Sequence, residues 1–269
     1  AIPCPLVLTS HDTIPAVPFS KLAIRHPSLL RFWNLDEYRQ MRRELFHAQK
    51  ADILTTVSHH ARRDIARFLH FSPEEQENKL RVIYNTLSPD FRPAAPEAVR
   101  ALKKQYDLPE NYCLYLGGLR TRKNVFGMLR AFRKLPRRLQ ETFPLVIADN
   151  LPDRMQNYIS RQKLPVQAVG QVPQADMCAL YSGARLFVFL SFYEGFGLPP
   201  VEAAACGTPS LISTMASLPE VGEGFSLSVS PFKPGKAAIL WKQLLEDQKL
   251  YSRLQEKCSI VHERFSRKQ

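Results

Sequence analysis

The sequence from Ser191 to Pro209 reads SFYEGFGLPPVEAAACGTP and directly follows the apolar run LFVFL at 186–190. A continuous apolar run of this length is typical of a strand that is covered on both faces of a parallel sheet. Prolines at 199 and 200 suit the first turn of a helix, where a missing N–H is harmless. Gly207 suits the left-handed residue just past the end of that helix. The stretch therefore predicts a strand, a glycine-containing loop and a helix.

The loop between this strand and this helix has the composition of an anion site. Open α/β sheets bind ligands at this edge, and the glycines at 195 and 197 let the backbone come close to a ligand. Free N–H groups and the positive end of the helix dipole favour an anion such as a diphosphate. The carboxylate of Glu194 can accept hydrogen bonds from sugar hydroxyls. Glu202 either accepts bonds from ribose hydroxyls or is an acid that the dipole favours there.

The rest of the chain alternates short apolar runs with segments of helical period, which is typical of βαβ units and a parallel sheet. One buried helical stripe is expected at Val125, Met128, Leu129, Phe132 and Leu135, and Ser58 is expected to cap a helix. We expect strands near residues 5–10, 52–57, 80–84, 112–116, 144–148, 166–169, 185–190, 209–212 and 225–229.

A proline-rich segment divides the chain. Residues 85–97 contain three prolines and show no periodicity, so a linker is predicted at 85–96. The fold class is α/β with two Rossmann-like domains. The first, at 1–84, has only three expected strands and is incomplete. The second, at 97–269, is nearly complete.

Composition narrows the functional classes. The net charge is +12, and residues 119–140 carry eight basic side chains and no acid, which suits a phosphorylated ligand or an anionic surface. No basic segment belongs to a known nucleic-acid module, so nucleic-acid binding is not expected. No apolar run is long enough to span a bilayer. The five cysteines are scattered, as expected for reduced thiols in a cytoplasmic protein.

The motifs resemble those of glycosyltransferase family 4. Glu194 and Glu202 have seven residues between them in the setting YEGFGLP, and YLGGLRTRKN at 115–124 resembles the first strand and loop of the family's donor domain. VGQV at 169–172 and SLPEV at 217–221 resemble the segments before and after the two-glutamate motif.

This resemblance implies a GT-B fold and a retaining hexosyltransferase, mannosyltransferase-like, that moves a sugar from a nucleoside diphosphate sugar to a glycan, lipid-linked or small acceptor. It implies no cofactor and no obligatory metal. His11 and Glu194 are the expected catalytic residues. Lys123 and Arg122 are expected to hold the diphosphate. The expected donor-binding residues are Gly118, Arg122, Lys123, Val172, Glu194, Gly195, Phe196, Gly197, Leu198 and Glu202.

Some features depart from the family pattern. Gly118 stands where a basic residue is common, so either Arg120 substitutes for it or the diphosphate is held with one cation fewer. Asp149 stands where glycine is common; this acid either alters the choice of sugar or caps the next helix, and the cap is the favoured expectation. The first strands of the acceptor domain and a final helix are expected to lie outside these 269 residues. A non-catalytic nucleotide-sugar-binding fragment is therefore the alternative. A phosphorylase or an epimerase would need a phosphate or base arrangement that the sequence does not present. The basic face suits peripheral contact with the inner face of an anionic membrane.

Overall fold

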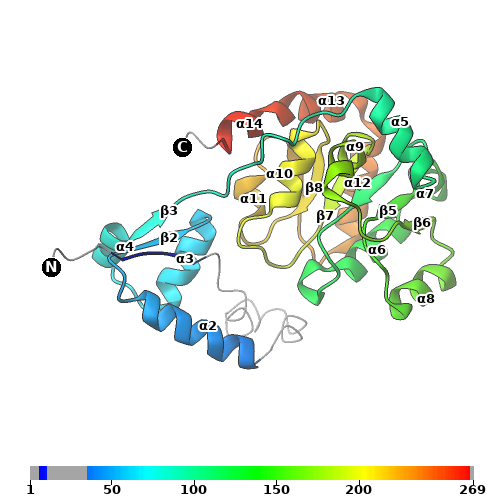
Figure 1. Ribbon diagram of the computed structural model, residues 1–269. Helices are drawn as coiled ribbons and strands as arrows, with labels where there is room; N and C mark the ends of the chain where they lie inside the picture. The colour runs from blue at the N-terminus through cyan, green and yellow to red at the C-terminus, as the bar shows by residue number, and fades with distance from the viewer. Residues whose placement is uncertain (1–5, 11–34, 267–269) are drawn as a thin grey trace. The chain divides into compact units, whose positions relative to one another are not determined.

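The computed structural model describes residues 6–10 and 35–266, and the chain divides into two compact units (Figure 1). The first unit comprises Ala1–Asn85, Phe192–Gly197 and Ala216–Val221. The second comprises Thr86–Ser191, Leu198–Met215 and Gly222–Gln269. Two short segments that the sequence assigns to the second domain, 192–197 and 216–221, thus belong to the first unit.

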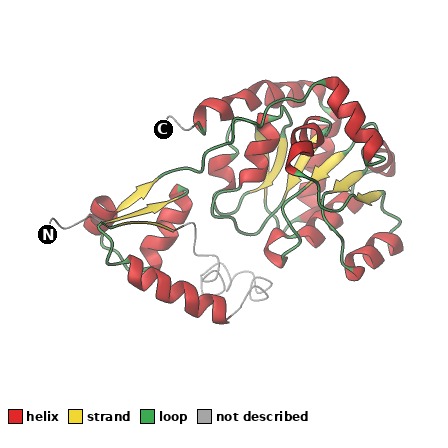
Figure 2. Ribbon diagram, viewed as in Figure 1, coloured by secondary structure: helices red, strands yellow, loops and turns green. Residues whose placement is uncertain are grey.

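A three-stranded parallel sheet with the order β1-β2-β3 forms the frame of the first unit (Figure 2). Ser58 begins α3 as the sequence predicts, because its side chain accepts a hydrogen bond from the N–H of Ala61. The elements are β1 (Val7–Ser10), α2 (Leu35–Ala48), β2 (Ile53–Thr56), α3 (His59–Phe68), α4 (Pro73–Lys79), β3 (Leu80–Val82) and, later in the chain, α11 (Leu218–Val221).

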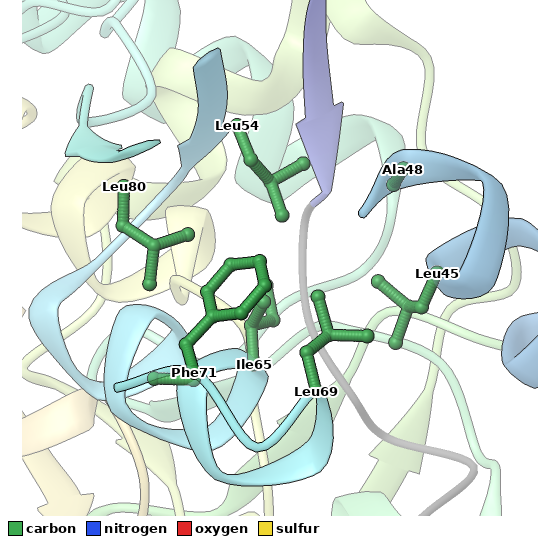
Figure 3. Packing of buried hydrophobic residues seen from close by; sticks show 8 residues of the cluster. Leu45, Ala48, Leu54, Ile65, Leu69, Phe71 and Leu80 are labelled. Carbon is green, nitrogen blue, oxygen red and sulfur yellow. The ribbon is translucent and has the colours of Figure 1, made fainter. Parts of the chain in front are cut away.

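One apolar cluster joins the sheet of the first unit to its helices (Figure 3). Leu54 of β2 and Leu80 of β3 come from the sheet, while Ile65 of α3 is completely buried on the helical side. The other buried members are Leu45, Ala48, Ala66, Leu69 and Phe71. This packing holds α3 against the sheet and so fixes the beginning of α3, where polar contacts gather.

A six-stranded parallel sheet with the order β6-β5-β4-β7-β8-β9 forms the second unit. Its strands are β4 (Cys113–Tyr115), β5 (Leu145–Ile147), β6 (Val166–Ala168), β7 (Leu186–Phe189), β8 (Ser210–Ser213) and β9 (Ser226–Val229). All residues of β4, β5, β7 and β8 are buried, as expected for strands that are covered on both faces. The expected α/β class with parallel sheets is confirmed.

Helices connect these strands and supply the rest of the core. They are α5 (Pro96–Gln105), α6 (Val125–Arg133), α7 (Arg137–Thr142), α8 (Asp153–Arg161), α9 (Met177–Ser182), α10 (Leu198–Ala205), α12 (Pro234–Glu246), α13 (Gln248–Glu256) and α14 (Ile260–Arg264), with short 3-10 turns η3 (Thr121–Lys123), η4 (Gln174–Asp176) and η5 (Lys257–Ser259). Phe132 of α6 packs on Trp241 of α12 with ring centroids 5.4 Å apart. The stripe predicted for α6 is buried in full.

The EGFG loop comprises residues 194–197, and the helix that follows it, α10, also forms as predicted. Leu198 begins α10, and the two prolines at 199 and 200 lie in its first turn. Gly207 follows the end of α10 with φ +83°, a left-handed conformation that glycine adopts without steric cost.

Candidate functional site

The order of the strands in the second unit contains one reversal. From β4 the chain builds outward through β5 and β6, and then returns so that β7 pairs with the other side of β4. Since β4 and β7 are parallel, their carboxyl ends meet at the same edge of the sheet. Open α/β sheets bind ligands outside the strand ends at such a reversal. The chain after β4 carries Gly118 and Lys123, and the chain after β7 carries the EGFG loop.

Asn124 connects the loop after β4 to the end of β7. It adopts a left-handed conformation with φ 56° and precedes the first residue of α6. Its side-chain amide donates to the carbonyl of Leu190 at 2.9 Å and to that of Pro231 at 3.2 Å. No side-chain hydrogen bond caps α6, so the first N–H groups of that helix keep their capacity to bind an anion.

We expect Asn124→Ala to lower the free energy of unfolding by about 3 kcal/mol or more. Two buried carbonyls lose their donor, at about 1–3 kcal/mol each, and alanine is strained in the left-handed region. Asn124→Gly relieves only the strain, so it should cost about 1 kcal/mol less. Denaturant unfolding measures both variants, with the exposed Asn157→Ala on α8 as a control. If Asn124→Ala is as stable as the wild type, the Asn124 amide does not stabilise the fold through the carbonyls of Leu190 and Pro231.

Lys123 is a nearly buried cation at the end of β7. Its side chain is 9% exposed, and its Nζ lies 4.9 Å from the ring centroid of Phe189, a distance typical of a cation–π contact. Close approach explains the neighbouring glycine, because a Cβ on Gly117 would lie 2.6 Å from the same ring. Gly118 has φ +79° and faces open space. Arg122 is half-buried in the same turn.

Glu202 of α10 lies in the same unit and forms a partly buried polar pair with Tyr181. It accepts a hydrogen bond from the Tyr181 hydroxyl at 2.9 Å. Burial raises the pKa of the Glu202 carboxyl, and the Tyr181 bond partly opposes this rise. The two residues come from adjacent helices, α9 and α10. Sequence patterns identified Glu202 but not its partner.

In the first unit, side-chain hydroxyls hold three successive carbonyls of the EGFG loop. The Ser58 hydroxyl donates to the Gly195 carbonyl at 2.8 Å. The Ser217 hydroxyl lies 2.6 Å from the Phe196 carbonyl and 3.0 Å from that of Glu194, and its single proton is shared between them. Glu194 is 7% exposed. Because three carbonyls of the EGFG loop accept these hydrogen bonds, the loop has a fixed orientation in the first unit.

Further hydrogen bonds join α3 of the first unit to the segments 192–197 and 216–221. The Tyr193 hydroxyl donates to an Asp64 carboxylate oxygen at 2.6 Å. The Glu220 carboxylate accepts from the backbone N–H groups of His59 and His60 at 2.8 and 3.1 Å, which the helix dipole favours. Burial alone would raise the pKa of Asp64, but bonds from His60 and Tyr193 and the charge of Arg67 outweigh it, and the pKa is lowered.

Three further predictions concern His11, Val172 and Asp149, and their outcomes differ. His11 lies outside the described residues. Val172 is half-buried in the turn after β6, and its role at the nucleobase stays a prediction. The expected helix cap by Asp149 is wrong: Pro152 occupies the N-cap of α8, and the Asp149 carboxylate accepts instead from the N–H of Asn150 at 2.8 Å. A carboxylate bonds the nearest free N–H, which here belongs to the loop and not to the helix.

Among the residues that the structure describes, no helix combines the length and the apolar character that crossing a bilayer requires. In the same part of the chain, no three His, Cys, Asp or Glu side chains form a group able to hold a metal ion.

Comparison with known proteins identifies related sequences. Residues 100–259 match the family model described as glycosyl transferases group 1. The chain is 32% identical over 206 residues to the O-antigen chain mannosyltransferase B of Escherichia coli, and this alignment covers 73% of this chain and 52% of that protein. It is 27% identical over 276 residues to the serotype-specific mannosyltransferase WbdA of Escherichia coli, covering 98% of this chain and 32% of that one.

Solved structures share the fold. Anabaena Alr3699/HepE in complex with UDP and glucose has a TM-score of 0.76 at 19% identity, covering 97% of this chain and 68% of that one. WaaG, a glycosyltransferase involved in lipopolysaccharide biosynthesis, has a TM-score of 0.73 at 15% identity, covering 97% and 71%. The chain thus spans 52% and 32% of the two curated relatives and about two thirds of each solved chain.

Proposed function

Because the chain belongs to the glycosyl transferases group 1 family, we propose that its protein moves a sugar from a nucleoside diphosphate sugar to a glycan, lipid-linked or small acceptor, with retention at the anomeric carbon. The observation that carries this proposal is the nearly buried Lys123 ammonium against Phe189, at the reversal between β4 and β7. A cation held there, next to the uncapped beginning of α6, suits a diphosphate.

The chemistry follows from the charge that develops during transfer. The leaving diphosphate gains negative charge in the transition state, and preorganised cations and backbone dipoles stabilise it. In the proposal Lys123 and Arg122 supply the cations, and the N-termini of α6 and α10 supply N–H groups. The EGFG loop and Leu198 bring backbone to the donor, with Glu194 as acceptor for the sugar hydroxyls. His11 completes the proposed catalytic pair.

The relatives favour a mannosyl donor. Two curated relatives are named mannosyltransferases, and the RKN sequence at 122–124 resembles that of family members with GDP-linked donors. We therefore include GDP-mannose as the first donor to test.

A membrane-proximal, cytoplasmic setting is part of the proposal. On α2 and just after it, Arg42, Arg43 and Lys50 are exposed, and Phe46 is 60% exposed. Basic side chains around an exposed aromatic ring suit an anionic lipid surface, at about 1 kcal/mol per Lys or Arg.

A donor screen tests the proposal. GDP-, UDP-, dTDP- and ADP-sugars are added separately to the chain, and thermal unfolding is followed. A bound donor at about 100 times its Kd adds about 2.7 kcal/mol of stability, or a Tm increase of about 2–4 °C per kcal/mol for a chain of this size. We expect one nucleotide class to stabilise the chain, and matching free sugars to have no effect. No stabilisation by any of the four classes would contradict donor binding.

A further inference from the structure

The polar pair between α9 and α10 is built more rigidly than a surface contact. Tyr181 is completely buried, and its ring packs edge-on against Phe187 and Phe91, with centroids 5.5 and 6.2 Å away. The Thr208 hydroxyl donates to the Tyr181 carbonyl at 2.6 Å. Ring and backbone are thus both held, so the phenol oxygen has a fixed position from which it donates to Glu202.

The phenol stays a donor at every physiological pH. Burial, and then the charge of Glu202, raise the pKa of Tyr181 well above its ordinary value. The bond engages one oxygen of Glu202, and a carboxylate has about four acceptor positions on its two oxygens. Glu202 is half-buried, so part of its acceptor capacity can still serve a ligand.

A second buried tyrosine, Tyr112, donates its hydroxyl hydrogen bond to the backbone and not to a charged side chain. Tyr112 is also completely buried, and its hydroxyl donates at 2.7 Å to the backbone carbonyl of Leu180. A backbone carbonyl is sufficient to satisfy a buried phenol. Tyr181 instead donates its hydrogen bond to the carboxylate of Glu202, on the helix that follows the EGFG loop. Burying a carboxylate costs free energy, whereas a backbone carbonyl would satisfy the phenol without that cost.

We propose that Tyr181 is a positioning residue for donor recognition: its hydroxyl orients the Glu202 carboxylate so that this carboxylate accepts hydrogen bonds from the ribose hydroxyls of the nucleotide. The inference rests on the proposed function, which assigns Glu202 to the donor. It adds a specificity determinant, because a site built to bond a ribose hydroxyl discriminates against a nucleotide that lacks it.

The test measures this discrimination directly. The full chain is titrated calorimetrically with GDP, 2′-deoxy-GDP and 3′-deoxy-GDP, and with the matching UDP series. Wild type should bind a ribonucleotide at least about tenfold more tightly than one of its deoxy analogues, since a charge-assisted bond contributes about 1.5–3 kcal/mol. Tyr181→Phe should weaken ribonucleotide binding about three- to tenfold and leave binding of that deoxy analogue nearly unchanged.

Matched variants separate positioning from structure. Tyr112→Phe removes the same atom from an equally buried ring and should keep the ribose preference. An equal loss of preference in Tyr112→Phe would overturn the proposal, because the effect would then follow from general loosening. Replacing Tyr181 by 4-aminophenylalanine restores an N–H donor and should restore the preference; failure to do so in a folded protein would also overturn it.

A further variant separates this inference from the proposed function. Glu202→Ala should abolish the ribose preference. If the preference survives in Glu202→Ala, or if wild type binds neither GDP nor UDP, the assignment of Glu202 to the donor fails and the role of Tyr181 fails with it. If Glu202→Ala loses the preference and Tyr181→Phe keeps it, only the role of Tyr181 is overturned.

Discussion

Lys123→Ala is expected to weaken the binding of a nucleoside diphosphate about 10- to 100-fold. A hydrogen bond between a cation and a phosphate contributes about 1.5–3 kcal/mol, and each 1.4 kcal/mol is a factor of ten in affinity. Lys123 is 9% exposed, so water screens its charge less than that of a surface lysine. Calorimetric titration measures the loss, and the matching nucleoside without phosphates should bind both proteins equally.

Lys134→Ala is the matched control for this substitution. Lys134 is exposed at the end of α6, so its removal changes the net charge equally without touching the end of β7. The Lys123 variant also loses its contact with Phe189, and unfolding without ligand measures that cost separately. Equal losses of affinity in the two variants would reduce the effect to net charge and contradict a specific diphosphate contact.

Glu194→Ala is expected to weaken the binding of the nucleotide sugar at least about tenfold while the free nucleotide binds as before. The reason is that the proposed partners of Glu194 are sugar hydroxyls, which only the sugar nucleotide carries, and a bond to a charged acceptor contributes about 1.5–3 kcal/mol. Comparing the Kd of GDP with that of GDP-mannose, or of the pair that the donor screen selects, isolates this contribution.

The control for Glu194→Ala is Glu256→Ala, which removes an exposed acid from the end of α13. Neither ligand should distinguish Glu256→Ala from wild type. If Glu194→Ala weakens the nucleotide and the nucleotide sugar equally, the residue supports the fold of the loop and does not contact the sugar. The Ser58 and Ser217 hydroxyls contact the loop through its backbone carbonyls and not through the Glu194 side chain, so these bonds remain available in the variant.

The strands were the most predictable part of the fold. Each expected strand contains or overlaps an observed one, as at β7, where the range 185–190 meets Leu186–Phe189. Strands that are buried on both faces need continuous apolar runs, and such runs are visible in a single sequence. The ends of α10 were equally visible, because prolines and Gly207 have specific backbone requirements.

Long-range polar contacts were not predictable in the same way. The sequence shows an asparagine at 124, but which carbonyls its amide reaches depends on how β7 and the segment around Pro231 are brought together. The same holds for Tyr181 and Glu202, which are 21 positions apart. Local sequence predicts a helix cap at Asp149, but the N–H of the adjacent Asn150 binds its carboxylate instead.

The site residues remain a prediction, but the strands before their loops were visible in the sequence. Sequence patterns pointed to the segments that follow β4 and β7 along the chain, and the structure pairs these two strands where the strand order reverses. They did not locate the support of those loops: Phe189 beneath Lys123, and the hydroxyls of Ser58 and Ser217 on the EGFG loop. Such support depends on tertiary packing, which periodicity does not encode.

In the proposed function, this chain holds a nucleoside diphosphate with its own cations and helix N-termini. Calorimetric titration of the chain with GDP and with UDP, in EDTA and again in excess Mg²⁺, tests this binding. We expect at least one nucleotide to bind in EDTA, with a Kd that Mg²⁺ changes less than about threefold and that Lys123→Ala raises about tenfold or more. Binding of neither nucleotide, or binding only when Mg²⁺ is present, would contradict this proposal.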